Sequence, residues 1–167
     1  MSYSILNENA RLEEIIMENN NIKTNRVISE FRDLLDKRGI TYELNKEDEN
    51  LIRFRTKLPN YEEIMPFVLI HFNDENGALS LALSKIAVFT KAGPDLYALV
   101  NHFNADPGCF GCKMFIDENG EVVVLTNAIV KSGDVIDLIE EYIKINILSI
   151  DRYFGQISEI INNSDKD

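Results

Sequence analysis

The sequence has no tryptophan, only two cysteines and few cationic side chains. The shortages of cysteine and of cations exclude several classes of fold and of binding partner. Its 167 residues contain 17 Lys and Arg against 28 Asp and Glu, which gives a net charge of −11 and an isoelectric point near 4.6. Binding to nucleic acid or to anionic membrane requires clustered cations, so we expect neither partner. Two cysteines are too few for a disulfide framework.

Long hydrophobic runs are also missing. Apolar runs such as Phe67-Val68-Leu69-Ile70 are far shorter than the roughly 18 residues of a membrane span. The N-terminus, Met1–Glu8, lacks the basic and apolar regions of a secretory signal. We therefore expect a cytoplasmic protein. Its apolar fraction of 45% is too high for a disordered acidic tail and suffices for the core of one domain.

The patterns predict one α+β domain over residues 23–162. We expect an accessory N-terminal helix within residues 1–22 and a disordered tail over residues 163–167. The first helix of the domain follows from an apolar stripe over residues 27–35, between a cap at Thr24 and a terminating Gly39. These helices are expected to flank an antiparallel sheet.

Alternation of apolar and polar residues predicts the strands of that sheet. Residues 40–44 and 52–56 alternate clearly, whereas residues 67–72 are apolar on both faces except at His71, which predicts a strand covered on both sides. The tetrapeptide Asp-Glu-Asn-Gly occurs at 74–77 and at 117–120 and predicts two hairpin turns, because Asn and Gly tolerate positive φ. We expect the second hairpin to run from Phe110 to Leu125, after a helix that begins at Pro94.

The last predicted helix, from Asp134 to about Asn162, carries apolar residues at steps of three and four, as in a heptad seam. At about 1.5 Å per residue this helix approaches 40 Å, which exceeds what one small domain needs. We therefore predict that the seam contacts a partner or a second copy of the chain. Gly155 indicates a bend or close packing. The seam consists of Ile136, Ile139, Ile143, Ile147, Ile150, Phe154, Ile157 and Ile161.

Two groups of residues could carry chemistry. Cys109 and Cys112 form a Cys-x-x-Cys sequence that leads into a predicted strand, which favours two core thiols. The alternative is a zinc or redox site with His102 as a third ligand. Since no second Cys-x-x-Cys exists, we predict no metal and no cofactor.

The second group is a basic row in an acidic chain, formed by Arg53, Arg55 and Lys57 along one strand face. Cross-strand pairing with Glu43 is one interpretation, and contact with an anion or an acidic peptide is the other. No motif places a nucleophile beside a histidine, and no glycine-rich phosphate loop is present. We therefore predict no catalytic residues.

The order of elements and four short motifs resemble the YbjN-like family over about residues 24–161. The motifs are Gly39-Ile40-Thr41-Tyr42-Glu43-Leu44, Leu51-Ile52-Arg53-Phe54, Leu99-Val100-Asn101-His102-Phe103-Asn104 and Phe115-Ile116-Asp117-Glu118-Asn119-Gly120. Members of this bacterial family are described as sensory transduction regulators. The resemblance implies the fold of the type III secretion chaperones, with the order α-β-β-β-β-α-β-β-α, together with homodimerisation and binding of a partner polypeptide in extended form.

Two functional hypotheses follow. The first is a non-enzymatic bacterial regulator or chaperone-like protein that binds a partner polypeptide and acts as a homodimer. The second is a small-molecule, zinc-dependent or thiol-dependent binding protein or enzyme centred on Cys109, Cys112 and His102.

Overall fold

The computed structural model describes residues 25–91, 93–130 and 134–164. The predicted N-terminal helix, Thr24 and residues 165–167 lie outside these ranges. The order of helices and strands is the predicted one, which confirms the α+β class. The elements are α2 (Arg26–Lys37), β1 (Tyr42–Leu44), β2 (Leu51–Arg55), β3 (Phe67–Asn73), β4 (Ala78–Ser84), α3 (Pro94–Ala105), a 3₁₀ turn (Pro107–Cys109), β5 (Lys113–Ile116), β6 (Val122–Ile129) and α4 (Val135–Ser164).

The six strands form one antiparallel sheet in the order β1-β2-β3-β4-β6-β5. The first four strands are a simple meander, and the second hairpin joins them through pairing of β6 with β4. Its register places Leu81 of β4 opposite Thr126 of β6. The edges of the sheet are therefore β1 and β5.

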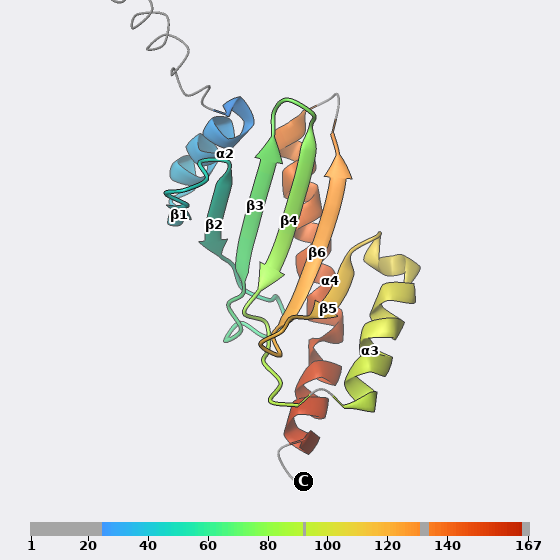
Figure 1. Cartoon of the computed structure of the whole chain (residues 1–167). Coiled ribbons are helices and arrows are strands. Elements are labelled where there is room, and N and C mark those ends of the chain that lie inside the picture. Colours follow the sequence, from blue (N-terminus) through green and yellow to red (C-terminus); the bar gives the residue numbers. More distant parts are fainter. Residues whose placement is uncertain (1–24, 92, 131–133, 165–167) are drawn as a thin grey trace, which may run out of the picture.

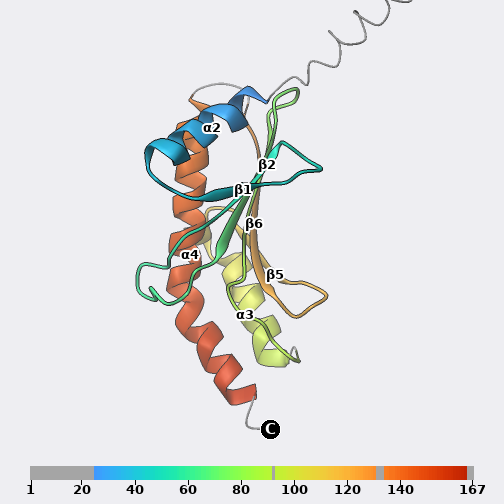
Figure 2. The same ribbon diagram turned by 90° about the vertical axis from the view of Figure 1, so that its left-hand side faces the viewer.

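The helices lie on one side of the sheet (Figures 1 and 2). Helix α4 runs along β4 and β6 and also contacts α2, while α3 packs between α4 and the edge strand β5. Alternate strand residues are buried beneath these helices, as at Val68 and Ile70 of β3. Together with α4 residues such as Ile139 and Ile150 they form a single core.

The prediction that residues 67–72 are covered on both sides is wrong. Val68, Ile70 and Phe72 are buried, but Phe67 and Leu69 are only half-buried and point to the other face. No helix in the described part of the chain lies over that face (Figure 2). An apolar run on both sides of a strand usually indicates two covered faces; here the second face is apolar and open.

Helix α2 has the predicted apolar stripe and the predicted C-terminal glycine. Gly39 has φ +68°, and its N–H donates to the carbonyl of Asp36, as in a left-handed helix end. At the other end the cap is Asn25 instead of Thr24. The Asn25 side chain accepts from the N–H of Ile28 at 3.1 Å.

Both Asp-Glu-Asn-Gly segments form hairpin turns, as predicted, and their glycines share a role that the repeat did not indicate. Gly77 and Gly120 have positive φ, and each carbonyl accepts a backbone N–H of another segment at 2.8 Å, from Val130 and Phe89 respectively. A Cβ on Gly77 would lie 2.2 Å from the carbonyl oxygen of Val130, and one on Gly120 would lie 2.0 Å from that of Phe89. Each turn is therefore closed against a neighbouring backbone.

Helix α4 begins after Asp134, whose carboxylate accepts from the N–H groups of Ile136 and Asp137 at 3.1 and 3.3 Å. The helix has 30 residues and continues through residues 163 and 164, which we expected in the tail. Close packing explains Gly155, because a Cβ there would lie 2.9 Å from the hydroxyl oxygen of Tyr61. No helix in the described ranges is long and apolar enough to span a membrane.

The second hairpin begins later than predicted. Phe110 and Gly111 have φ values of +48° and +82°, so the backbone turns there and β5 starts at Lys113. Phe110 is consequently 71% exposed, because it lies in this turn and not in the strand that we predicted from residue 110.

Candidate partner-binding surface

The uncovered face of the sheet, which we call the open face, carries an apolar band across four strands. Pairing aligns Leu69 of β3 with Ala82 of β4, and Ala82 with Leu125 of β6. Phe67 and Phe115 lie in the adjacent row, and Phe115 is 41% exposed. A solvated sheet face normally alternates to polar residues. The apolar residues of this band are Phe67, Leu69, Ala82, Phe115, Val123 and Leu125.

The predicted basic row borders this band, and its three members have different partners. Arg53 pairs with Glu43 across β1 and β2, through a contact of 3.1 Å from Nε, so cross-strand pairing accounts for this residue. Lys57 lies 3.6 Å from the carboxylate of Glu62. Both ion pairs are exposed and contribute little stability.

Arg55 is the member of the row that has no carboxylate partner among the described residues. It donates to the carbonyl of Met65 at 2.9 Å, and its guanidinium lies 3.9 Å from the centre of the Phe67 ring. The guanidinium of Arg53 lies 4.6 Å from the same ring centre. Contact with the same aromatic ring orients both guanidinium groups at the border of the apolar band.

The two edges of the sheet differ in their access to a further strand. At β5, the Asn104 side chain on α3 donates to the carbonyl of Met114 at 3.0 Å and accepts from its N–H at 2.8 Å. At β1, the outer edge borders a hollow of about 370 Å³ between the strand and α2, lined in part by Ile28, Arg32 and Leu44. Among the described residues, strand addition is therefore blocked at Met114, whereas nothing covers the outer edge of β1.

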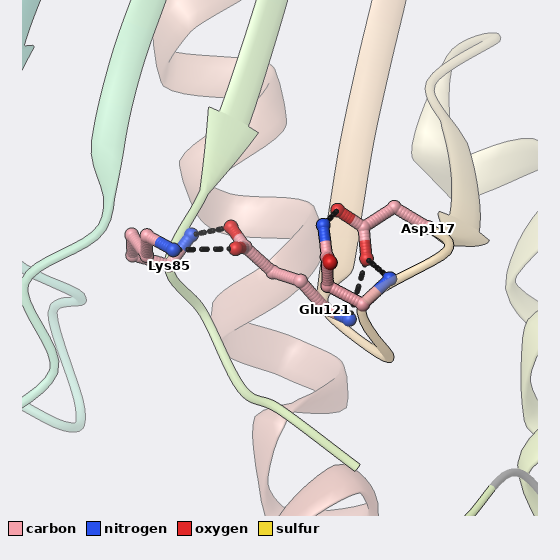
Figure 3. Close-up of polar contacts among 4 residues, drawn as sticks. Lys85, Asp117 and Glu121 are labelled. Carbon is pink, nitrogen blue, oxygen red and sulfur yellow. Dashed lines mark hydrogen bonds and ion pairs between the residues drawn. The ribbon is translucent and has the colours of Figure 1, made fainter. Parts of the chain in front are cut away.

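A buried carboxylate joins β4 to the second hairpin (Figure 3). Glu121, which is 7% exposed, accepts from the backbone N–H of Lys85 and from its ammonium at 2.8 Å. Lys85 has φ +57°, an unfavourable conformation for a lysine. The two contacts of Glu121 hold this conformation and direct the chain after β4 along the start of β6, where Val88 pairs with Glu121.

Asp117 fixes the other side of the same turn. Its carboxylate accepts from the N–H groups of Glu121 at 2.8 Å and Asn119 at 2.9 Å, and the Glu121 N–H lowers the pKa of Asp117. Beside this turn lies an open pocket of about 550 Å³ between α3 and β5, with Tyr97 and Phe115 in its lining. Tyr97 is 57% exposed, so this pocket presents two aromatic rings to solvent.

The thiols of Cys109 and Cys112 are both free and buried. Burial raises the pKa of Cys109, which opposes formation of a reactive thiolate. The Cys112 sulfur accepts from the Thr126 hydroxyl at 3.4 Å. His102 packs its ring edge-on against Tyr153, with centroids 5.7 Å apart. Within the described ranges, no three His, Cys, Asp or Glu side chains are placed to hold a metal ion.

Asp106 organises the surroundings of Cys109. Its carboxylate accepts from the N–H of Gly108 at 2.8 Å, from the Tyr153 hydroxyl at 2.9 Å and from Arg152 at 3.2 Å. The Gly108 N–H, followed by the Tyr153 hydroxyl, lowers the pKa of Asp106. Burial, together with the hydrogen bond to Asp106, raises the pKa of Tyr153 to about 12. This network ties the 3₁₀ turn to α4.

The predicted seam of α4 is divided between the core and the surface. Four members, Ile139, Ile150, Phe154 and Ile157, are buried in the chain's own core. The other four, Ile136, Ile143, Ile147 and Ile161, are half-buried and pack at the core margin. Polar residues that the periodicity omitted share the buried side, of which Asn146 is fully buried and donates to the Thr126 hydroxyl at 2.9 Å.

No family model and no curated protein sequence matches the chain. Similarity is found among solved structures. The fold matches a chain in the crystal structure of the ExsC–ExsE complex with a TM-score of 0.58 and 14% identity, covering 80% of this chain and 94% of that one. A chain in the heterodimeric ExoU–SpcU complex from the type III secretion system of Pseudomonas aeruginosa gives a TM-score of 0.47 and 13% identity over 72% and 92%.

The match to the ExsC–ExsE structure establishes the fold, which is the one that the resemblance to type III secretion chaperones implies. Membership of the YbjN-like family stays a prediction. The apolar band, Asn104 and Glu121 were not predicted as functional or organising residues. The sequence contained a partial signal for two of them. Asn104 lies in one of the four motifs that resemble the YbjN-like family, and Glu121 directly follows the second Asp-Glu-Asn-Gly turn.

Proposed function

We propose that the chain is a non-enzymatic, type III secretion chaperone-like protein that binds a partner polypeptide in extended form in the bacterial cytoplasm. The observation that carries this proposal is the open face, where an apolar band crosses four strands without a helix of the described chain above it. Exposed apolar patches of this kind mark interaction surfaces. The similarity of fold to a chain from a protein complex adds support.

The β1 edge supplies the second element of this binding mode. A strand added beside Tyr42–Leu44 gains main-chain hydrogen bonds, which do not depend on the partner's sequence. Alternate side chains of that strand would enter the hollow against α2, near Ile28 and Leu44. The edge thus provides affinity for a backbone, and the hollow and the apolar band provide selection for aliphatic or aromatic side chains.

Site-specific photo-crosslinking in source cells tests this proposal. A photoreactive residue at Leu125, within the open face, is expected to form a covalent adduct with another polypeptide. The matched control has the same residue at Gln156, an exposed position on α4. Adducts at Gln156 without adducts at Leu125 would contradict the proposal, as would adducts with lipid or nucleic acid alone.

We further propose a homodimer in which the second copy binds at the pocket between α3 and β5. The ring of Tyr97, which is 57% exposed on the α3 side of this pocket and lies outside the apolar band, makes this region a stronger candidate than α4, where half of the predicted seam is already buried in the core. Aromatic side chains are enriched in protein interfaces. On α4 the alternative contact would use the exposed Leu148.

Sedimentation of the full chain distinguishes the two surfaces. Tyr97→Glu is expected to convert the dimer to a monomer, whereas Leu148→Glu is expected to leave it dimeric. The reverse result would assign the dimer to α4, as the seam predicts. A wild-type monomer at micromolar concentration would exclude the homodimer.

A further inference from the structure

We infer that the N-terminal segment of this chain, residues 1–24, binds the open face of its own sheet and covers the apolar band. The inference begins from the place where the described chain starts. Asn25 donates from its side chain to the carbonyl of Phe72 and to Asn50, and the N–H of Arg26 donates to Asp74 at 2.7 Å. The segment therefore joins the domain at the rim of the sheet, at the β3–β4 turn.

The distance from this rim to the apolar band matches the extended length of residues 19–24, which precede the first described residue. Leu69 and Phe67 lie four and six residues before Asn73, which is about 14 to 20 Å along a strand at 3.4 Å per residue. Residues 19–24, which include the sequence Asn19-Asn20-Asn21, span at most about 20 Å when extended. Residue 18 can thus reach the band, and the preceding residues can lie across it.

The segment has the composition that this surface accepts. Residues 5–18, which the sequence predicts as a helix, combine aliphatic side chains such as Leu12, Ile15 and Ile16 with four glutamates. Within residues 1–24 these four glutamates face only two cations, Arg11 and Lys23. The segment is therefore both apolar and acidic.

Cations on the open face are placed where they can pair with the glutamates of this segment. Arg55 borders the band on β2, and Lys113 borders it on β5; neither has an ion-pair partner in the described part of the chain. Four strand spacings separate β2 from β5, or about 19 Å. Glu8 and Glu18 would be about 15 Å apart in a helix. Carboxylates at both ends of an aliphatic helix can therefore meet cations at both ends of the band.

This arrangement would place the segment on the surface that we assign to the partner, so that the partner must displace it. The competition rests on the proposed function, whereas the docking of residues 1–24 does not. Coverage by the chain itself also gives the apolar band an occupant before a partner arrives.

Photo-crosslinking within the full chain tests the docking. A photoreactive residue at Ile16 is expected to crosslink to peptides of the same chain that contain Leu69 or Leu125. Mixing isotopically heavy and light chains distinguishes crosslinks within one chain from those between two copies. Crosslinks to α2 or α4, crosslinks between copies, or no crosslinks would each overturn the inference.

Charge reversal provides a second, independent test that leaves the core intact. Arg55→Glu is expected to lower the yield of the Ile16 crosslink about fivefold, the upper range for one exposed ion pair. Lys57→Glu is the matched control on the same row, and is expected to have little effect because Lys57 already pairs with Glu62. Equal yields from both variants would contradict the proposed charge matching.

Each of the two proposals can be refuted without refuting the other. If Ile16 crosslinks elsewhere while Leu125 still captures a polypeptide in cells, only the docking of residues 1–24 is wrong. If Ile16 crosslinks to the open face and Leu125 captures no other polypeptide, the docking stands and the proposed function is wrong.

Discussion

The side-chain amide of Asn104 binds both backbone polar groups of Met114, accepting from its N–H at 2.8 Å and donating to its carbonyl at 3.0 Å. This is the pairing that a neighbouring strand would otherwise make with the edge of β5. A single side chain from α3 therefore takes the place of a strand. The opposite edge, β1, has no such contact among the described residues, which gives the sheet a preferred end for strand addition.

Asn104→Ala is expected to expose the edge of β5. The Met114 N–H would lose its acceptor and exchange with solvent about fivefold faster, as expected for the loss of one hydrogen bond worth about 1 kcal/mol. Hydrogen exchange followed by NMR measures this rate. Asn101→Ala, an exposed position on the same helix, is the control. An unchanged Met114 rate would show that the amide is not the protecting group.

Gly120→Ala is expected to destabilise the fold more than Gly39→Ala, although both positions have positive φ. At Gly39 a Cβ meets nothing within 4 Å, so only the backbone conformation is penalised, by about 1–2 kcal/mol. At Gly120 the Cβ would overlap the Phe89 carbonyl as well. Urea denaturation compares the free energies of unfolding; equal losses would mean that the turn can move away from Phe89.

Asn146→Ala is expected to lower the free energy of unfolding by about 1–3 kcal/mol, because the buried Thr126 hydroxyl loses its partner on α4. The paired change Asn146→Leu with Thr126→Val removes both polar groups and should restore part of this loss. Urea denaturation of the single and double variants measures the coupling. Additive losses would indicate that the two side chains do not interact.

Alkaline pH is expected to destabilise the fold through Tyr153. Its folded pKa of about 12 lies above the ordinary 10.0, so the folded state retains a proton that the unfolded state releases. The stability from this group is fully present below pH 10 and is lost between pH 10 and 12. Tyr153→Phe should remove this part of the pH dependence. A tyrosine titration in which every ring ionises near pH 10 would contradict it.

The helices and turns were predictable because their signals are local. The stripe before Gly39 and the two Asp-Glu-Asn-Gly turns depend on residues a few positions apart, and the structure confirms both. The open face was not predictable in this way. Whether a second layer covers Phe67 and Leu69 depends on where distant helices pack, and an apolar strand has the same pattern in either case.

The α4 seam shows the same limit of sequence patterns, because the burial of its residues depends on distant packing partners. Apolar spacing correctly indicated a long helix, and it could not separate residues that pack inward, such as Ile139, from those at the margin, such as Ile143. Asn146 was missed because a buried asparagine depends on a partner, Thr126, that lies 20 residues away in sequence. The Cys109 environment similarly depends on Asp106 and α4 together.

The two turn glycines limit how the chain can change over evolution. Because Gly77 and Gly120 each accept a hydrogen bond from a segment outside their own hairpin, an inserted residue in either turn would break a contact that sequence-distant backbone makes. In the β1–β2 connection, Asn45–Asn50, the polar contacts with other described segments lie at its C-terminal half: Asp48 is 3.4 Å from His71, and Asn50 bonds with the Asn25 side chain and with the N–H of Phe72. Residues 45–47 have contacts only within their own hairpin in the described part of the chain. Homologous chains should therefore vary in length at that connection while keeping glycine at both turns.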